Sequence, residues 1–209
     1  MRVFVDYDGT ITDEDTFDAL VNAFAGADVW QKHEDDLQSG ALTLRQALAA
    51  NAQTLRCTID EADEFIARST RFDPTFAAFA ARCQHEGVPL TILSSGLGPL
   101  IERALERNGL THVPLLSNGA IPHHTGWRMT FRDDSEHGHD KAIAVRQARS
   151  AGEYVVFIGD GISDLSAALE ADRVFVRRGR QLEGFLKKRG VAFSPFDTFD
   201  EIEKELFRI

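Results

Sequence analysis

The sequence predicts an α/β fold in which a parallel sheet carries helices on both faces. The first observation is a series of short runs rich in β-branched and aromatic residues, which are typical of buried strands. The second is that helical segments separate most of these runs, so the strands must be parallel, with crossovers over the sheet. The third is a block between residue 15 and about residue 71 that has helical periodicity and no convincing strand. The predicted strands are Arg2–Asp6, Pro89–Leu93, Val113–Ser117, Tyr154–Ile158 and Arg173–Val176.

The predicted helices follow in chain order. The block after the first strand contains Thr16–Ala25, Val29–Gln38, Leu44–Leu55 and Ile59–Ser69. Beyond this block the pattern predicts helices over Phe76–Glu86, Leu97–Asn108, Lys141 to about Arg149, and from Leu165 onward. A residue before proline leaves the helical region, so Phe72-Asp73-Pro74 is expected to return the chain to the sheet. Trp127–Arg132 alternates large and polar side chains, and we expect it to pair with Leu115–Asn118 as a small β-hairpin.

Charge and composition narrow the classes of function. The chain has 23 basic and 33 acidic residues, a net charge of −10, which disfavours nucleic acid and anionic membranes as partners. The two cysteines, Cys57 and Cys83, match no metal-ligand spacing and are expected to be reduced, partly buried thiols. The sequence shows no apolar stretch of about 18 residues and no signal peptide, so we expect a cytoplasmic protein.

Two acids follow the first predicted strand. Asp6 and Asp8 are two residues apart, and Gly9 and Thr10 come next. Side chains two apart on an extended segment project to the same side, so the two carboxylates are expected to lie close together. Such a pair requires a metal ion, a shared proton or a cationic neighbour. Mg²⁺ would suit the site, with one acid attacking phosphorus and the other moving protons. An acidic turn is the structural alternative.

Three later segments favour the catalytic interpretation. The strand Val155–Ile158 ends in Gly-Asp160-Gly, with Ser163 and Asp164 at a predicted helix start; a tight turn and N-cap is the alternative. The strand Pro89–Leu93 leads into Ser94, Ser95 and Gly96, whose hydroxyls and N–H groups form an anion site if a helix starts there; a simple N-cap is the alternative. Lys141 opens a helix and suits a phosphate or a carboxylate cluster, although a lone helix lysine is usually solvated.

The order Asp-x-Asp-Gly-Thr, Ser, Lys, Gly-Asp-Gly-x-x-Asp resembles that of the haloacid dehalogenase superfamily. The chain looks most like the phosphoserine-phosphatase-like branch. The resemblance implies a Rossmann-like, doubly wound core formed by residues 1–14 and 74–209, with residues 15–73 as a small helical cap. It also implies that Asp6 is the nucleophile and Asp8 the general acid and base.

The same resemblance assigns the remaining site residues. Mg²⁺ would be held by Asp6, the backbone carbonyl of Asp8, and Asp160, with Asp164 supporting the metal. Ser94 would bind the phosphoryl group, and Lys141 would brace it. The expected substrate-binding set is Thr10, Asp15, Ser94, Ser95, Gly96, Lys141 and Ser163.

Substrate choice is expected to differ from that of phosphoserine phosphatases. The cap arginine that grips the substrate carboxylate in those enzymes has no counterpart in the stretch 46–53, although Arg45 and Arg56 flank it. Asp-Tyr-Asp-Gly-Thr-Ile-Thr looks closer to the methionine-salvage phosphatase, but His137-Gly138-His139 replaces its cysteines before the lysine. We favour a loop role for both histidines; the alternative is that they reach the rim of the active site, since they border Lys141. The pair His123-His124 is assigned to a solvated turn.

These expectations combine into one function. The chain is predicted to be a Mg²⁺-dependent phosphomonoester hydrolase of a small phosphorylated metabolite, working through an aspartyl-phosphate as a monomer or homodimer. The alternatives are a phosphoserine phosphatase, a phosphotransferase to an acceptor alcohol, and a receiver-like phospho-acceptor protein. Asp8 and the long cap argue against the receiver, because rapid turnover needs an acid/base beside the nucleophile.

Overall fold

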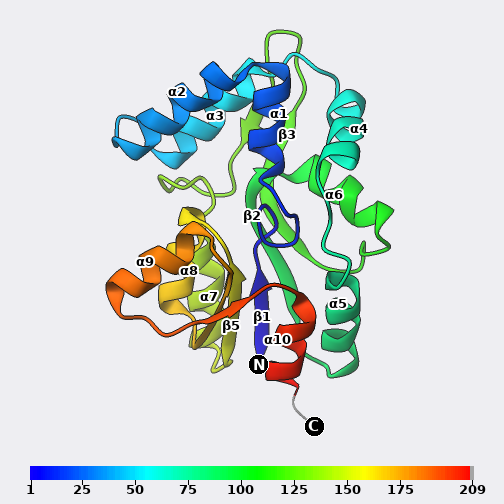
Figure 1. Cartoon of the computed structure of the whole chain (residues 1–209), viewed down its shortest axis with the longest axis vertical. Helices are drawn as coiled ribbons and strands as arrows, with labels where there is room; N and C mark the ends of the chain where they lie inside the picture. Colours follow the sequence, from blue (N-terminus) through cyan, green and yellow to red (C-terminus); the bar gives the residue numbers. More distant parts are fainter. Residues whose placement is uncertain (208–209) are drawn as a thin grey trace.

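A seven-stranded sheet lies at the centre of the protein (Figure 1), whose structure, a computed structural model, describes residues 1–207. The strand order is β4-β3-β2-β1-β5-β6-β7, and only the β3–β4 pair is antiparallel. The parallel α/β fold that the sequence predicts is therefore confirmed. The strands are β1 (Arg2–Val5), β2 (Leu90–Leu97), β3 (Leu115–Ile121), β4 (Arg128–Thr130), β5 (Val155–Gly159), β6 (Arg173–Arg177) and β7 (Ser194–Phe196).

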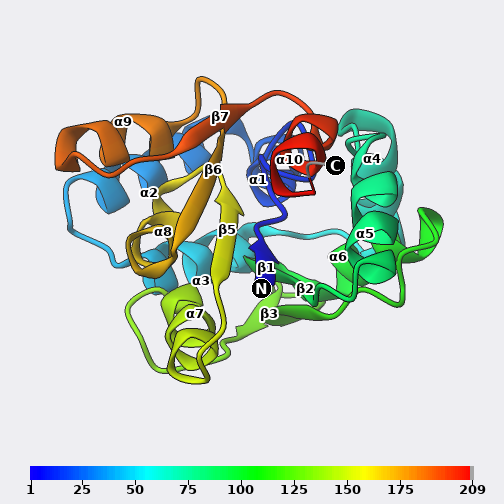
Figure 2. The same ribbon diagram turned by 90° about the horizontal axis from the view of Figure 1, so that it is seen from below.

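Helices cover both faces of the sheet (Figure 2). On one face α5 (Phe76–His85), α6 (Gly98–Arg107) and α10 (Phe199–Leu206) pack against Val3 and Val5 of β1. On the other face α7 (Lys141–Ser150), α8 (Leu165–Glu170) and α9 (Gln181–Arg189) pack against Phe4. Successive side chains of a strand point to opposite faces, so β1 contributes to both cores and is buried at the centre of the sheet.

Four helices lie beyond the carboxyl ends of the strands: α1 (Thr16–Phe24), α2 (Ala27–Gln38), α3 (Leu44–Thr54) and α4 (Ile59–Ser69). Thr43 and Thr58 begin α3 and α4 with capping boxes, in which the threonine side chain and a Gln or Glu three residues later satisfy free N–H groups. Phe17, Leu20 and Val21 of α1 enter a third apolar cluster with residues of α3 and α4. This cluster also includes Leu97, Leu100 and Ala120, so it joins the helical block to β2, α6 and β3.

The helical block is attached to the core through its two linkers, through the hairpin β3–β4, and through ion pairs of Arg103 and Arg107 in α6 with acids of α4. Its entry and exit segments run side by side, joined by the bridge between Thr12 and Phe72 and by the bond from the Asp73 amide to the Ile11 carbonyl (2.8 Å). The hairpin β3–β4 provides the second attachment, because Trp127 is fully buried in the third cluster and its Nε1 donates to the Cys57 carbonyl (2.8 Å).

Three features differ from the sequence prediction. The hairpin exists, but β4 pairs with Gly119–Ile121 rather than with Leu115–Asn118. Strand β2 continues four residues beyond Leu93, through an irregularity between Ser94 and Leu97, so α6 begins later than expected. The last strand and two helices, β7, α9 and α10, were not predicted; β7 is short and contains Pro195, which only an edge strand tolerates. Among the described residues, no helix is long and apolar enough to cross a membrane.

Candidate active site

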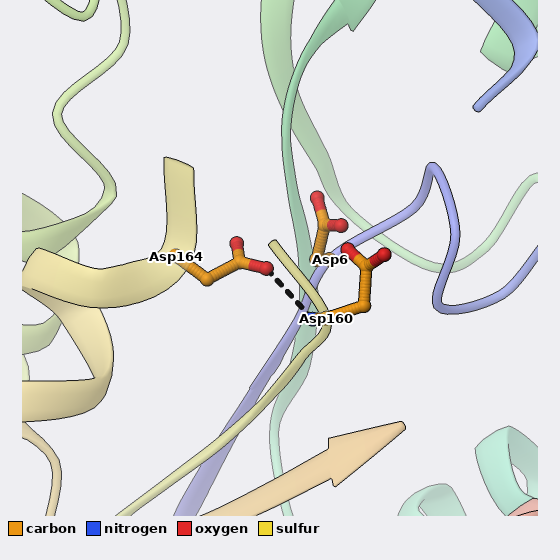
Figure 3. Close-up of side chains that lie close together, drawn as sticks. All are labelled: Asp6, Asp160 and Asp164. Atoms are coloured by element: carbon orange, nitrogen blue, oxygen red, sulfur yellow. Dashed lines mark hydrogen bonds between the residues drawn. The ribbon is translucent and has the colours of Figure 1, made fainter. Parts of the chain in front are cut away.

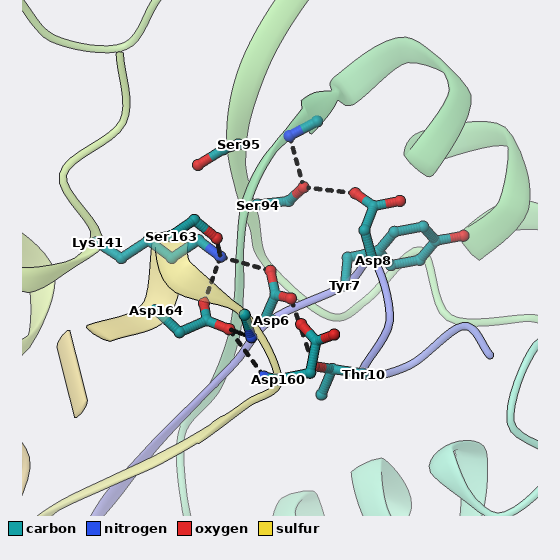
Figure 4. A network of polar contacts seen from close by, with 12 residues as sticks. Asp6, Tyr7, Asp8, Thr10, Ser94, Ser95, Lys141, Asp160, Ser163 and Asp164 are labelled. Carbon is teal, nitrogen blue, oxygen red and sulfur yellow. Dashed lines mark hydrogen bonds and ion pairs between the residues drawn. The ribbon is translucent and has the colours of Figure 1, made fainter. Parts of the chain in front are cut away.

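The two acids after β1 lie at the carboxyl end of the central strand (Figure 4). Asp6 is buried, and the Thr10 hydroxyl donates to its Oδ2 over 3.4 Å. Asp8 accepts hydrogen bonds at Oδ1 from the amide (3.0 Å) and hydroxyl (2.5 Å) of Thr16, and at Oδ2 from Ser94 (3.3 Å). Burial raises the pKa of the Asp8 carboxyl to about 7, and Asp15 adds to the shift. The two acids therefore have different partners, and Asp8 can carry a proton near neutral pH.

Lys141 is the buried cation of the site. Its Nζ lies 2.5 Å from Asp6 Oδ1, 2.6 Å from Asp164 Oδ1 and 3.3 Å from Ser163 Oγ. The residue is 1% exposed, which excludes the solvated surface position considered from the sequence. Although burial alone would lower the pKa of Lys141, Asp164 and Asp6 raise it, so the ammonium stays charged. Asp140 caps the helix by accepting from the Ala142 amide (3.0 Å), and this fixes where Lys141 begins α7.

Three carboxylates converge beside this lysine (Figure 3). One oxygen from each of Asp6, Asp160 and Asp164 lies within 4.8 Å of the others. Asp164 is fully engaged, since its Oδ2 accepts from the amides of Asp160 (2.9 Å) and Gly161 (3.1 Å). The Asp160 carboxylate accepts no hydrogen bond from any residue in the range 1–207.

The charge balance of this cluster fits a divalent cation. One ammonium faces three acids, and burial, followed by the charge of Asp6, raises the pKa of Asp160 to about 9. Carboxylate oxygens at this spacing are ligands that Mg²⁺ prefers. The Asp8 side chain lies outside the cluster, and the role expected for its backbone carbonyl stays a prediction.

The Ser94–Gly96 segment forms the next wall of the site. It lies within the irregular end of β2 rather than at a helix start, because α6 begins at Gly98. The N-cap alternative for these serines is therefore wrong, because Leu97 is the N-cap of α6, whereas the anion site stays a prediction. Two side chains hold the irregular backbone: His139 Nδ1 donates to the Ser94 carbonyl (2.8 Å), and Asn118 Nδ2 donates to the Ser95 carbonyl (2.9 Å).

The amide of Gly96 donates to Ser94 Oγ (2.9 Å). A Cβ atom at Gly96 would lie 2.5 Å from Asp8 Oδ2, so the close approach of β2 to Asp8 requires glycine. The Ser95 hydroxyl is buried and has no hydrogen-bond partner among the described residues. It borders the same cavity as Asp6 and Asp8. A donor is thus left free beside the acids.

Two of the residues that shape the site were not identified from the sequence. His139 is 4% exposed, in contrast to the solvated loop we expected, whereas His137 is exposed as expected. Burial lowers the pKa of His139 to about 4, so the ring is neutral, with its proton on Nδ1. The position of His139 two residues before Lys141 was the available signal. No sequence signal pointed to Asn118, because an asparagine at the end of a strand is common in turns.

A cavity of about 440 Å³ joins these residues to the helical block. Its floor includes Asp6, Asp8, Gly96, Asp160 and Ser163, together with Ser95. Asp15 lies at its side, where it caps α1 by accepting from the amides of Phe17 and Asp18 (both 2.9 Å). Thr10 is fully buried behind Asp6 and does not border the cavity, which differs from the substrate contact expected for it.

The roof of the cavity comes from α2 and α3. It contains Trp30, His33, Glu34, Leu37, Leu48 and Asn51, among other residues. Neither arginine that flanks the predicted cap stretch reaches it. Arg45 donates to the Asp133 carbonyl (2.5 Å) and stacks on Phe131, and Arg56 donates to the Gln53 carbonyl (2.5 Å). Among the lining residues in the range 1–207, only Arg180 is an arginine or lysine, and it donates to the Asp13 carbonyl.

Comparison with protein families identifies residues 3–169 as a match to the haloacid dehalogenase-like hydrolase family. The chain is 33% identical to Pdp3-interacting factor 1 of Schizosaccharomyces pombe, over 100% of this chain and 96% of that protein. It is 31% identical to the polyol phosphate phosphatase PYP1 of Saccharomyces cerevisiae, over 96% of this chain and 90% of that protein. It is 30% identical to a 2-hydroxy-3-keto-5-methylthiopentenyl-1-phosphate phosphatase of Microcystis aeruginosa, over 98% of this chain and 96% of that protein.

Solved structures share the fold. A phospho-aspartyl intermediate analogue of phosphoserine phosphatase superposes with a TM-score of 0.74, covering 97% of each chain at 18% identity. A substrate-bound phosphoserine phosphatase complex has a TM-score of 0.73, over 97% of this chain and 96% of that one, also at 18% identity. At this level of identity the likeness concerns the fold alone.

Proposed function

Because the chain belongs to the haloacid dehalogenase-like hydrolase family and is a phosphatase, we propose that it hydrolyses a small phosphate monoester through a phosphorylated Asp6. The observation that carries the proposal is the geometry around Asp6, which contacts Lys141 at 2.5 Å and shares a carboxylate cluster with Asp160. An enzyme of this class is not a regulatory receiver, since a receiver keeps its phosphoryl group rather than turning it over.

In the first step an Asp6 oxygen attacks phosphorus in line. The bond between phosphorus and the leaving alcohol oxygen breaks, and Asp8 gives its proton to that oxygen. The hydrogen bonds from Thr16 and Ser94 hold the Asp8 carboxyl in place for this transfer. The free Ser95 hydroxyl and the Ser94–Gly96 backbone lie beside the acids, where they can donate to phosphoryl oxygens.

In the second step Asp8, now a carboxylate, takes a proton from water. The water oxygen attacks phosphorus, the bond to Asp6 breaks, and inorganic phosphate leaves. Lys141 stays bound to Asp6 and compensates its charge throughout. The residues that would hold Mg²⁺ are Asp6, Asp160 and the Asp8 carbonyl, with Asp164 in support; the bound ion neutralises negative charge on the phosphoryl group.

The same proposal divides the chain into a catalytic core of residues 1–14 and 74–209 and a cap of residues 15–73. The paired linkers at Thr12 and Phe72 support this division. A cap over the cavity excludes bulk water from the phosphorylated acid and selects the leaving group. Cys57 and Cys83 are buried free thiols, in keeping with a proposed cytoplasmic location.

The test is hydrolysis of a generic aryl phosphate by wild-type protein and by Asp6→Asn, with Mg²⁺ and after exhaustive chelation. Asp6→Asn is expected to lose at least about 10³-fold in kcat, because no nucleophile remains. Asp134→Asn is the matched control, since the Asp134 side chain is fully exposed. Phosphate-analogue trapping with a metal fluoride should require both Mg²⁺ and Asp6. Near-normal turnover by Asp6→Asn, or full activity without divalent metal, would contradict the mechanism.

A further inference from the structure

The roof of the cavity contains a buried polar pair that the chemistry at Asp6 does not use. His33 of α2 and Asn51 of α3 meet with 2.5 Å between Nδ1 and Oδ1, and both border the cavity. An amide oxygen only accepts hydrogen bonds, so His33 Nδ1 must donate. When the ring carries its single proton on Nδ1 it has Nε2 as an acceptor, and Asn51 has its amide N–H groups as donors. Asn51 is 8% exposed and His33 is half-buried.

The groups around this pair determine which leaving groups fit. The half-buried carboxylates Asp18 and Glu34 border the same cavity and provide further acceptors. Acids repel a second anionic group on the substrate. Among the described residues that border the cavity, Arg180 is the only arginine or lysine, and it donates to the Asp13 carbonyl. A carboxylate-bearing ester such as phosphoserine is therefore disfavoured.

A purely apolar leaving group is disfavoured for a different reason. Trp30, Leu37 and Leu48 could contact a hydrocarbon or thioether chain. Such a chain would displace water from His33 and Asn51 and return no hydrogen bond, leaving buried polar groups unpaired. Hydroxyl groups both donate and accept, so they match a roof of amide donors, an imidazole acceptor and carboxylate acceptors.

On the basis of the proposed function, we infer that the His33–Asn51 pair selects neutral, polyhydroxylated phosphate monoesters by hydrogen-bonding the hydroxyls of the leaving group. The pair acts as a unit: the His33 ring holds the Asn51 amide in the orientation that presents its donors, and Asn51 fixes the tautomer that presents the His33 acceptor. Its side chains come from neighbouring cap helices, so the selectivity depends on the packing of α2 against α3.

The experiment compares kcat/KM for polyol phosphates with that for alkyl phosphates of the same carbon number. Glycerol 1-phosphate is paired with n-propyl phosphate, and sorbitol 6-phosphate with n-hexyl phosphate; phosphoserine and an aryl phosphate complete the panel. Wild-type protein should favour the polyol in at least one pair by about 100-fold or more, and phosphoserine should be a poor substrate.

Asn51→Leu and His33→Leu should each lower the polyol-to-alkyl ratio of kcat/KM by about 10- to 100-fold, the range expected for lost hydrogen bonds. The double variant should lower the ratio no further than the worse single variant, because the two residues act together. Gln53→Leu is the control: Gln53 is exposed on the same helix and does not border the cavity. Should Asn51→Leu fail to fold, Asn51→Asp keeps the acceptor for His33, removes the amide donors and must lower the ratio too.

The outcomes separate this inference from the proposed function. Aryl phosphate hydrolysis that depends on Mg²⁺ and Asp6, combined with equal use of polyol and alkyl phosphates, would overturn the inference alone. The inference would also be overturned if the variants at His33 and Asn51 had the same polyol-to-alkyl ratio of kcat/KM as Gln53→Leu. A preference for phosphoserine would overturn it as well. Loss of all hydrolysis in the wild-type protein would overturn both.

Discussion

At the residue scale the protein concentrates ionisable groups where the sheet ends. Lys141 compensates Asp6 and Asp164 at hydrogen-bond distance, but Asp160 has no donor within residues 1–207. Buried charges are tolerated only when they are paired and hydrogen-bonded. The unpaired acid is consequently a destabilising group unless a cation binds, which links metal affinity to folding.

His139 provides a pH prediction at this scale. Its pKa is lowered to about 4 by burial, from 6.5, so between these values the unfolded chain binds more protons than the folded one. Stability from the neutral ring is therefore complete above pH 6.5 and is lost as pH falls toward 4. His139→Gln keeps a donor for the Ser94 carbonyl but does not titrate. The advantage of wild type over this variant in free energy of unfolding should shrink by roughly 2 kcal/mol between pH 7.5 and pH 5.

The measurement is denaturant unfolding in a chelator across this pH range. His137→Gln serves as the control, because His137 is an exposed residue of the same loop. Its difference from wild type should stay flat with pH. Parallel pH profiles for wild type and His139→Gln would show that the His139 ring does not titrate abnormally.

At the element scale, the hairpin β3–β4 connects the sheet to the helical block. Gly119–Ile121 pairs with Arg128–Thr130, and the turn between them delivers Trp127 into the cluster of Phe17, Leu55 and Ile66. The irregular end of β2 lies next to this hairpin and holds Ser94 and Ser95. The hairpin thus supports the helical block and, through Asn118 in β3, the serine wall of the cavity.

Trp127 gives the prediction for these elements. Trp127→Phe leaves a cavity and deprives the buried Cys57 carbonyl of its donor. We expect the free energy of unfolding to fall by about 2–4 kcal/mol, from the cavity and the unsatisfied acceptor together. Chemical denaturation measures the loss. Ile121→Thr in the same hairpin is the comparison; Ile121 is 61% exposed, so its change should stay within about 0.5 kcal/mol. Equal effects of the two substitutions would show that Trp127 does not anchor the hairpin.

At the scale of the whole molecule, net charge and metal binding act on stability together. The chain carries a charge of −10, and its three clustered carboxylates lie at the centre of the fold. Mg²⁺ at about 100 times its dissociation constant should add about 2.7 kcal/mol of stability. For a chain of this size we expect Tm to rise by about 5 to 10 °C.

Two substitutions should distinguish the roles of Asp160 and Asp164, because they should change the Tm of the metal-free protein differently. Asp160→Asn removes an unpaired, half-buried acid, so it should match or exceed wild type in Tm without metal and lose most of the Mg²⁺-dependent rise. Asp164→Asn removes a partner of Lys141 and weakens the acceptor of two backbone amides, so its Tm without metal should fall. Thermal unfolding with and without Mg²⁺ tests both. An undiminished rise in Asp160→Asn would place the ion elsewhere.

The sequence alone was sufficient for the alternation of strands and helices and for the acids at strand ends. These features are local: side-chain period, capping residues and glycine turns act within a few residues. Because parallel strands end at one edge of the sheet, the proximity of Asp6 and Asp160 also followed from the pattern, whereas the place of Lys141 beside them followed only from the order of the motifs and the family resemblance. Even so, the predicted start of α6 at Leu97 is one residue too early. No local pattern indicates an irregular strand end that is held by His139 and Asn118.

The tertiary structure alone decided which side chains face the cavity. His33 and Asn51 are 18 residues apart and meet only because α2 packs beside α3. Arg45 flanks the expected carboxylate site in sequence, yet its contacts with Asp133 and Phe131 hold it away from the cavity. Periodicity identifies the buried face of a helix but not the side chain opposite it, because that depends on how helices pack and on the segment that competes for each charge. The sequence therefore identified the residues of the chemistry proposed at Asp6, and packing determined which side chains surround the cavity.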